Sequence, residues 1–450
     1  MTPPLATAGV LAQRVGAPTP TGIASTLASL IADGSLAPGD RLPTVRDFAR
    51  ALGVSPATVS TAWQALAGAG AIIARGRAGT FIRQTETDAV TPHTTRLAGH
   101  VEQTRLDLSR GTPDPALLPD LARAFARATP RAGTASYHDS PVLPALERQL
   151  RAGWPEPSHR ITILDGALDA IDRSLQQLTR FGDRVIIEEP TFPPFHDLLE
   201  ALHLVAVPVE MDENGMLPDA LADALGCGPR AVLLQPRAQN PTGASMSAGR
   251  AAEIADVLRL SPRGRALTVI EDDHSDAIAQ ASPVSLAPAL PEQTLVVRSF
   301  SKSHGPDLRI AALGGPDAVV ERIEARRTLG AWWTPRFIQR IVAELLVDGE
   351  AIADLALARA TYAARQRRFA AALSSELGHE VGAFDGINAW IPVADERAAI
   401  VSLAAQGIRA AAGSAFTLSD ASDRIRLTIG ALDSDPAPIA AAVARASRAG

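Results

Sequence analysis

The 450-residue sequence has a single cysteine, no long hydrophobic run and a single lysine. With Cys227 alone, no disulfide can form within the chain, which favours a reducing compartment, so we expect a cytoplasmic protein. No apolar run approaches the ~20 residues that a membrane helix needs, so we predict no membrane span. The first residues, MTPPLATAGVLAQRVG, have no basic stretch ahead of an apolar one, which argues against a signal peptide.

Lysine is almost absent: the sequence has 43 Lys plus Arg, and Lys302 is the only lysine among them. The two side chains serve about equally well on a solvated surface, so a bias toward arginine costs little at most positions. The bias fails where the chemistry needs a primary amine that can lose its proton and attack a carbonyl, because guanidinium stays protonated. Lys302 is therefore either a chance survivor of such a bias or a nucleophile.

The charge of the chain is unevenly spread. Its net charge is -6, which alone argues against binding to nucleic acid. Residues 20–84, however, carry six Arg and three Asp, a balance of +3, so the rest of the chain carries -9. A chain of 450 residues, 46% of them apolar, is long enough for two or three globular domains. These numbers predict a small basic module joined to a larger acidic one.

The basic module shows the helical period three times. The apolar stripes are residues 23, 27, 30 and 31, then 45, 48, 49 and 52, then 59, 62, 63 and 66. Thr44 is a good N-cap for the second helix with Asp47 as its capping-box partner, Gly53 supplies a turn, and Ser55 with Pro56 starts the third helix. The segment AIIARGRAGTFI is typical of two short strands around a Gly-Arg-Ala-Gly turn. This order predicts a winged helix-turn-helix domain over residues 16–84.

Such a domain places its third helix in the major groove of DNA. Arg46, at the start of the second helix, can reach backbone phosphates, and the wing can reach phosphates or the minor groove. The alternative is a helical protein-interaction module with a solvated arginine face. The predicted DNA contacts are Thr44, Arg46, Ser55, Ala57, Thr58, Ser60, Arg75, Gly76 and Arg77.

This stretch resembles the GntR family of bacterial regulators. The matching segments are GSLAPGDRLPTVRDFARALGVSPATVSTAWQALAGAGAI and the wing RGRAGTFI. The family usually has arginine after the serine of the VS pair, where this chain has Pro56, so the resemblance does not supply that phosphate contact. The fold is unaffected, because proline is tolerated at the first helical position. Residues 85–105, which are polar and without a sustained period, are predicted to be a flexible linker.

Between residues 106 and 450, short apolar runs alternate with helical patterns. The runs are 161–164, 185–189, 231–235, 267–273, 294–300 and 310–315. This alternation predicts an α/β sheet that is covered by helices on both faces. In such sheets, ligands collect at the carboxyl ends of the strands.

Several of these strand ends carry polar or aromatic residues. The residues are Gly166, which opens a helix, Phe192, Asn240, Asp272, Asp273, His274, Ser301, Lys302 and Arg309. Each has an ordinary structural explanation when taken singly, as a turn, a core aromatic or a helix cap. Together they fit pyridoxal 5′-phosphate, which needs a Schiff-base lysine, a carboxylate for its pyridinium nitrogen and an aromatic side chain against its ring. Its phosphate needs hydroxyls, an arginine and helix N–H groups.

Residues 106–450 resemble the fold type I aminotransferases, and the whole chain is similar to the MocR subgroup of GntR regulators. The segments that carry this resemblance are SFSKSHGPDLRIA, QNPTG, EDDH, FGDRVIIEEPTF and DRIRLTIG. The resemblance implies an α/β main domain of the PLP-dependent transferase fold type I, with a mixed, mostly parallel sheet and a small C-terminal α+β subdomain. The winged helix-turn-helix domain precedes it.

The resemblance also implies a role for each site residue. Lys302 would form the Schiff base, Asp272 would hold the pyridinium proton, Asn240 would bond the ring oxygen and Phe192 would stack on the ring. Tyr137 would reach the phosphate bound in the partner subunit. The phosphate ligands would be Ser299, Ser301, Arg309 and the backbone at Gly166, Ala167 and Leu168. Arg426 would pair with a ligand α-carboxylate, with a surface arginine on a strand as the alternative. No metal site is predicted.

Two departures from the family pattern bear on catalysis. His274 stands where tyrosine is usual; it can still donate to the ring oxygen, but histidine titrates near neutral pH. Leu168 replaces a common glutamine beside the phosphate. Neither change removes cofactor binding, but both make efficient transamination less expected.

The two modules together predict a PLP-dependent, ligand-responsive transcription regulator. The N-terminal domain would bind operator DNA, and an amine, an amino acid or a B6 vitamer would act at Lys302 in a head-to-tail homodimer that reads two half-sites. The segments RAQNPTG and RSFSKSHGPDLR are closer to regulators of B6-related genes than to regulators that sense γ-aminobutyrate. Two alternatives stay open: a working aminotransferase with an appended DNA-binding head, and a sensor for which pyridoxal phosphate itself is the effector.

Overall fold

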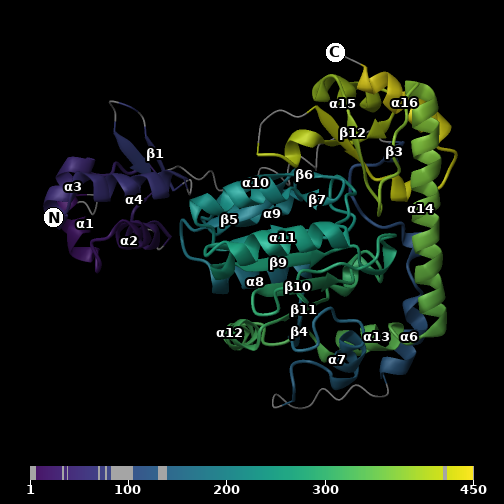
Figure 1. Cartoon of the computed structure of the whole chain (residues 1–450), viewed down its shortest axis with the longest axis horizontal. Coiled ribbons are helices and arrows are strands. Elements are labelled where there is room, and N and C mark those ends of the chain that lie inside the picture. The colour runs from purple at the N-terminus through teal and green to yellow at the C-terminus, as the bar shows by residue number, and fades with distance from the viewer. Residues whose placement is uncertain are drawn as a thin grey trace. The chain divides into compact units, whose positions relative to one another are not determined.

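The structure is a computed structural model in which the chain forms two compact units, each described by itself (Figure 1). The structure describes residues 7–32, 35–37, 39–68, 71–74, 76, 79–82, 105–129, 139–418 and 423–448. Three predicted site residues, Arg75, Arg77 and Tyr137, lie outside the described residues, as do residues 85–104 of the predicted linker. None of the helices in the described segments is long and apolar enough to span a membrane.

Residues 7–82 contain short helices followed by a hairpin. The elements are α1 (Ala8–Arg14), α2 (Pro20–Ala32), α3 (Val45–Leu52), α4 (Pro56–Gly68), β1 (Ile72–Ala74) and β2 (Thr80–Ile82). The two strands pair antiparallel, with Ile72 opposite Ile82. The three predicted apolar stripes meet in one core, where the ring centroids of Phe48 and Trp63 lie 5.3 Å apart. Helix α1, which was not predicted, adds Leu11 to this core.

The local sequence explains where α3 and α4 begin and end. Thr44 Oγ1 accepts a hydrogen bond from Asp47 N at 3.2 Å and donates one to the Asp47 carboxylate at 2.7 Å, a form of the predicted capping interaction. Gly53 ends α3 with φ +68, a conformation that favours glycine. Pro56 occupies the first position of α4, where its missing N–H costs nothing. The turn between the two helices is therefore encoded by its own residues.

The larger part of the chain is centred on an eight-stranded sheet. Its strands are β4 (Arg160–Leu164), β5 (Arg184–Glu189), β6 (Val205–Asp212), β7 (Gly215–Met216), β8 (Ala231–Leu234), β9 (Thr268–Asp273), β10 (Thr294–Ser299) and β11 (Ala311–Gly315). Their order is β4-β11-β10-β9-β8-β5-β6-β7. Strands β8, β9 and β10 are parallel neighbours, whereas β11 runs antiparallel to both β10 and β4. All six predicted apolar runs form strands of this sheet, and β6 and β7 were not predicted.

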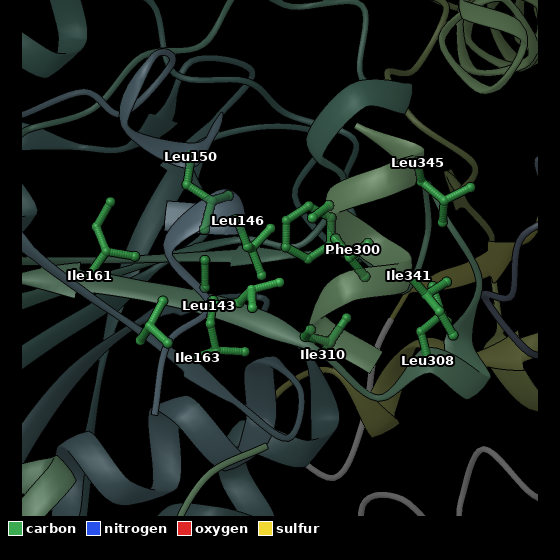
Figure 2. Packing of buried hydrophobic residues seen from close by; sticks show 14 of the residues in the cluster. Leu143, Leu146, Leu150, Ile161, Ile163, Phe300, Leu308, Ile310, Ile341 and Leu345 are labelled. Atoms are coloured by element: carbon green, nitrogen blue, oxygen red, sulfur yellow. The ribbon is translucent and has the colours of Figure 1, made fainter. Parts of the chain in front are cut away.

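Helices cover both faces of this sheet. In β4, for example, every residue from Ile161 to Leu164 is buried, although successive side chains point to opposite faces. The helices are α6 (Leu121–Ala128), α7 (Pro144–Arg151), α8 (Ala167–Leu178), α9 (Pro193–Ala201), α10 (Pro218–Ala224), α11 (Ala248–Leu260), α12 (Asp317–Arg327) and α13 (Arg336–Leu345). Figure 2 shows Leu146 and Leu150 of α7 with Ile161 and Ile163 of β4 in one apolar cluster. Helices α8 and α12 contact β4 and β11 as well.

The C-terminal part forms a smaller α+β layer. Its elements are α14 (Gly349–Leu377), β12 (Ala389–Pro392), α15 (Glu396–Ala404), β13 (Ile408–Arg409), β14 (Ala411–Ala412), β15 (Arg424–Leu427) and α16 (Ala437–Ser447), and β3 (Leu106–Asp107) pairs with β13. Strands β12, β15 and β14 form an antiparallel sheet in this order. Phe369 of α14, Ile425 of β15 and Val443 of α16 share its buried core. The long helix α14 runs along the edge of the larger domain in Figure 1.

Candidate functional site

The single lysine lies just beyond β10. Ser299 ends the strand, Phe300 is buried, and Lys302 Nζ donates to the carbonyl oxygen of Gly111 at 2.6 Å. Burial, together with the charge of Arg426, lowers the pKa of Lys302 to about 8, against an opposite effect of Asp272. A larger share of this amine is neutral near pH 7 than in an exposed lysine. Neutral amine is the form that attacks a carbonyl.

Asp272 lies near the end of the neighbouring strand β9 and is 3% exposed. Its Oδ2 accepts from Gln235 Nε2 at 2.8 Å, whereas Oδ1 is buried without a hydrogen-bond partner among the described residues. Burial raises the pKa of Asp272 to about 7, while the bond from Gln235 and the charge of Lys302 oppose the rise. A buried carboxylate oxygen without a partner requires a donor, and a protonated ring nitrogen is one.

A second group of predicted residues lies at the N-terminus of α8. Gly166 has φ +107, and a Cβ there would lie 2.7 Å from Arg309 Nη2, so the guanidinium packs directly against the glycine. The same Nη2 donates to Asp165 O at 3.2 Å. The sheet brings Ser299 to this end, since Ser299 pairs with Ala311, which pairs with Leu164. A helix N-terminus, a guanidinium and serine hydroxyls are groups that bind phosphate.

Arg426 of β15 is buried, and its guanidinium is held on three sides. Nη1 donates to Asn240 Oδ1 at 3.1 Å, Nη2 donates to Ser109 O, and the guanidinium lies 4.9 Å from the ring centroid of Phe416. Burial lowers the pKa of Arg426 to about 9. No carboxylate pairs with it among the residues that the structure describes. The surface alternative is therefore wrong, and a buried cation in this state favours an anionic ligand.

Gly111 connects Lys302, which is partly buried, with Arg426, which is buried. Its carbonyl accepts from Lys302 Nζ at 2.6 Å, and a Cβ at this residue, where φ is +63, would lie 3.0 Å from Arg426 Nη1. Its N–H donates to Thr428 Oγ1 at 2.8 Å, directly after β15. Sequence reasoning missed Gly111 and Ser109, because nothing near them in the chain marks a site. Only the fold brings them to residues that lie 191 and 317 positions further on.

The predicted DNA contacts that the structure describes lie on α3, on α4 and in the hairpin turn. Arg46 and Ala57 are exposed, and Ser60 is partly exposed. Ser55 Oγ and Thr58 Oγ1 bond each other at 2.9 Å, and the Thr44 hydroxyl is bonded to Asp47, so these three hydroxyls already have partners. Gly76 has φ +54, which suits a tight turn. Arg46 has no ion pair among the described residues, unlike Arg50, which pairs with Asp47 at 3.3 Å.

Two family models match the chain. The model of aminotransferase class I and II matches residues 103–443, and the model of bacterial regulatory proteins, gntR family, matches residues 20–82. The vitamin B6 salvage pathway transcriptional repressor PtsJ of Salmonella typhimurium is 38% identical over 411 residues, which cover 89% of this chain and 91% of that protein. This chain belongs to the MocR-type GntR regulators. It is a transcriptional regulator with an aminotransferase class I and II domain.

Other comparisons agree with this membership. The pyridoxine biosynthesis transcriptional regulator PdxR of Corynebacterium glutamicum is 27% identical over 341 residues, 73% of each chain. The solved kynurenine aminotransferase of Pyrococcus horikoshii has a TM-score of 0.70 and 18% identity, covering 81% of this chain and 94% of that one. The structural likeness confirms the predicted fold type I domain with its mixed, mostly parallel sheet.

Pyridoxal phosphate is the cofactor that this MocR-type fold implies, and the residues present fit it. The fit rests on three observations: the lowered pKa of the Lys302 amine, the unpartnered Oδ1 of Asp272, and the Gly166–Arg309 contact at the start of α8. Phe192, directly before α9, places its ring edge-to-face against Phe195 at 5.5 Å, so the ring is fixed in orientation. Ala167 and Leu168 lie in the first turn of α8.

His274 behaves differently from the expectation. Its Nε2 lies 3.0 Å from Ala238 O, and a carbonyl only accepts, so this nitrogen carries the proton. Nδ1 is then the acceptor that faces Ser275 Oγ at 3.3 Å. Burial lowers the pKa of His274 to about 4, with the positive charge of Lys302 adding to the effect. The imidazole is therefore neutral at pH 7 in this regulator rather than titrating there, and its one N–H is already used.

Proposed function

We propose that this regulator binds operator DNA through its N-terminal domain and senses a small amine, an amino acid or a B6 vitamer at Lys302. The single observation that supports the proposal most is the placement of the only lysine. Its amine lies beside Asp272, and the pKa of each responds to the charge of the other. The names of PtsJ and PdxR, which both refer to vitamin B6 metabolism, make genes of B6 metabolism the proposed targets.

Each site residue then has a defined task. Lys302 would hold the cofactor through its amine, Asp272 would hold a proton on the ring nitrogen through Oδ1, and Asn240 would bond the ring oxygen. Phe192 would cover one face of the ring. The phosphate would be bound by Ser299, Ser301, Arg309 and the backbone of Gly166, Ala167 and Leu168. Bound pyridoxal phosphate supplies a carbonyl carbon that condenses reversibly with primary amines.

A competing amine would free Lys302, and the freed amine of Lys302 would donate to Gly111 O. The bond of 2.6 Å between Lys302 Nζ and this carbonyl gives the free amine a fixed place. Because Gly111 also packs against Arg426 and bonds Thr428, the state of Lys302 would be transmitted to β15. Arg426 would bind the carboxylate of an amino acid at the same time, in place of its contact with Asn240. We propose that these shifts change the affinity for the operator.

We further propose a head-to-tail homodimer that reads two half-sites. Cofactor sites of this fold type lie between subunits, and two-fold symmetric regulators bind operators with matching symmetry. Analytical ultracentrifugation of the purified chain should give a dimer. A monomer that still binds the operator with full affinity would contradict this part of the proposal.

The function is tested by an operator-shift assay with pyridoxal phosphate present, in which amines, amino acids and B6 vitamers are screened. The parent should respond to one of these classes, and Lys302→Ala should not respond. Borohydride treatment of the parent should yield a pyridoxyl adduct on Lys302, detected by mass spectrometry. A Lys302→Ala protein that responds as the parent does would overturn the proposed role of this amine.

A further inference from the structure

We propose that Gln235 is a positioning residue that holds Asp272 and Asn240 together at the end of β8. These are the two side chains assigned above to the nitrogen and the oxygen of the cofactor ring, so the inference rests on the proposed function and deepens it. The sequence analysis gave Gln235 no role, and it is placed as the last residue of an apolar run. Its side chain nevertheless bonds both the carboxylate of Asp272 and the backbone N–H of Asn240.

The contacts of Gln235 link three polar segments. Nε2 donates to Asp272 Oδ2 at 2.8 Å, and Oε1 accepts from Asn240 N at 2.9 Å. The backbone N–H of Gln235 donates to Glu188 Oε2 at 3.1 Å. Strands β8 and β9 are parallel neighbours with Leu234 opposite Glu271, so Gln235 lies beside Asp272 by register. Gln235 is 3% exposed, which means that water cannot replace these bonds.

An amide suits this position because its two ends have opposite polarity. A carboxylate such as Asp272 only accepts, and the backbone N–H of Asn240 only donates, so one amide can satisfy both and its orientation is fixed by them. A leucine of similar size would leave the Asp272 carboxylate and the Asn240 N–H both unpaired. A glutamate would still accept from Asn240 N, but its second oxygen would face the Asp272 carboxylate, and the two would have to share a proton.

The surroundings of Gln235 keep it in place. Glu188 accepts from Gln235 N and from Gln239 Nε2, and Gln239 Nε2 also donates to Pro190 O at 2.8 Å. Gln239 Oε1 accepts from Thr242 N at 3.0 Å, so the loop that carries Asn240 is fixed from both sides. Burial raises the pKa of Glu188 to about 8, so this carboxyl is mostly protonated at pH 7. Asp272, with a pKa of about 7, is therefore the more acidic of the two carboxyls, and the bond from Gln235 favours its ionised form.

The test compares Gln235→Leu and Gln235→Glu with Gln339→Leu as a matched control. Gln339 is also a buried glutamine that bonds backbone groups, but its partners are Leu143, Pro141 and Thr334. For each protein, we would measure the apparent Kd of pyridoxal phosphate and the pH at which the absorbance of the bound cofactor changes. Gln235→Leu should bind pyridoxal phosphate roughly 10- to 100-fold more weakly, since a bond to a buried charge is lost. The pH at which the absorbance of the bound cofactor changes should shift as well. Gln339→Leu should change neither.

Gln235→Glu gives a pH signature that a purely structural role does not predict. Its affinity for pyridoxal phosphate should be near that of the parent at pH 6, where a shared proton bonds the two carboxyls, and should fall more steeply than the parent's toward pH 8.5. This profile decides the matter if Gln235→Leu does not fold. Parallel pH profiles of the parent and Gln235→Glu would overturn the proposal. A parent that forms no borohydride adduct would instead overturn the proposed function, so the two failures are distinct.

Discussion

The substitution Gly166→Ala tests whether the cofactor phosphate binds at the start of α8, where the guanidinium of Arg309 packs against Gly166. Gly166 has φ +107, and an added Cβ would lie 2.7 Å from Arg309 Nη2, closer than real Cβ contacts. The backbone strain of an alanine with positive φ is about 1–2 kcal/mol. The guanidinium is exposed and flexible, so it can move aside without much further loss of folding free energy. We therefore expect a modest loss of stability and a larger loss of phosphate binding.

Gly215→Ala is the matched control for this substitution. Gly215 has φ +93 in the same part of the chain, and its nearest contact to an added Cβ is Met246 at 3.9 Å, an ordinary distance. Both variants should lose about 1–2 kcal/mol of unfolding free energy. Only Gly166→Ala should displace Arg309, and a lost charge-assisted bond of about 1.5–3 kcal/mol corresponds to roughly 10- to 100-fold weaker binding of pyridoxal phosphate.

The assay is an absorbance titration of each protein with pyridoxal phosphate and, separately, with pyridoxal, which lacks the phosphate. Gly166→Ala should lose affinity for the phosphorylated form and keep its affinity for pyridoxal. Urea unfolding of both variants supplies the stability comparison. If Gly166→Ala and Gly215→Ala bind pyridoxal phosphate equally well, the phosphate does not lie at the start of α8.

Three further predictions concern Lys302, Arg426 and Arg46. Capture of pyridoxal phosphate by the apoprotein should accelerate as pH rises toward about 8 and then level off, because Lys302 loses its proton there; a rate that still climbs steeply toward pH 10.5 would contradict the lowered pKa. Arg426→Gln should weaken the operator response to amino acids by roughly 10- to 100-fold and leave the response to amines without a carboxylate unchanged, as read in operator-shift titrations. Arg46→Ala should weaken binding to all DNA sequences and reduce the salt dependence of log K by about one unit. Arg50→Ala should change both less, because the cation of Arg50 is already paired with Asp47. Equal effects of the two substitutions would refute the assignment of Arg46 as a phosphate contact.

The elements that the sequence predicts well are those with a local cause. The capping interaction between Thr44 and Asp47, the glycine turn at Gly53 and the six apolar runs all lie within a few residues of the features that produce them. Lys302 was found for a different reason, since its rarity among the cations marks a position where arginine cannot replace it.

Other features depend on residues far apart in the chain. Strand β6 carries Pro208, a residue that disfavours a strand assignment, and it is a strand only because β5 and β7 flank it. The tautomer of His274 is set by Ala238 O, 36 positions away, so no local pattern reveals that this imidazole is neutral and already bonded. Gln235 and Gly111 act through partners that the sheet and the C-terminal layer bring to them, and neither residue type marks a site by itself.

The charges of the buried site indicate which effectors it should recognise. Arg426 is buried and Lys302 is partly buried, and the charge of Arg426 disfavours the protonated form of Lys302. Asp272 opposes this effect, but it is one carboxylate beside two cations and burial disfavours its ionised form, so the site carries a deficit of negative charge. A ligand that brings a carboxylate to Arg426 removes part of this cost, because an anion beside a buried guanidinium stabilises its charge. An amine without an anionic group gains nothing there, so we propose that the site binds amino acids more tightly than simple amines of equal reactivity.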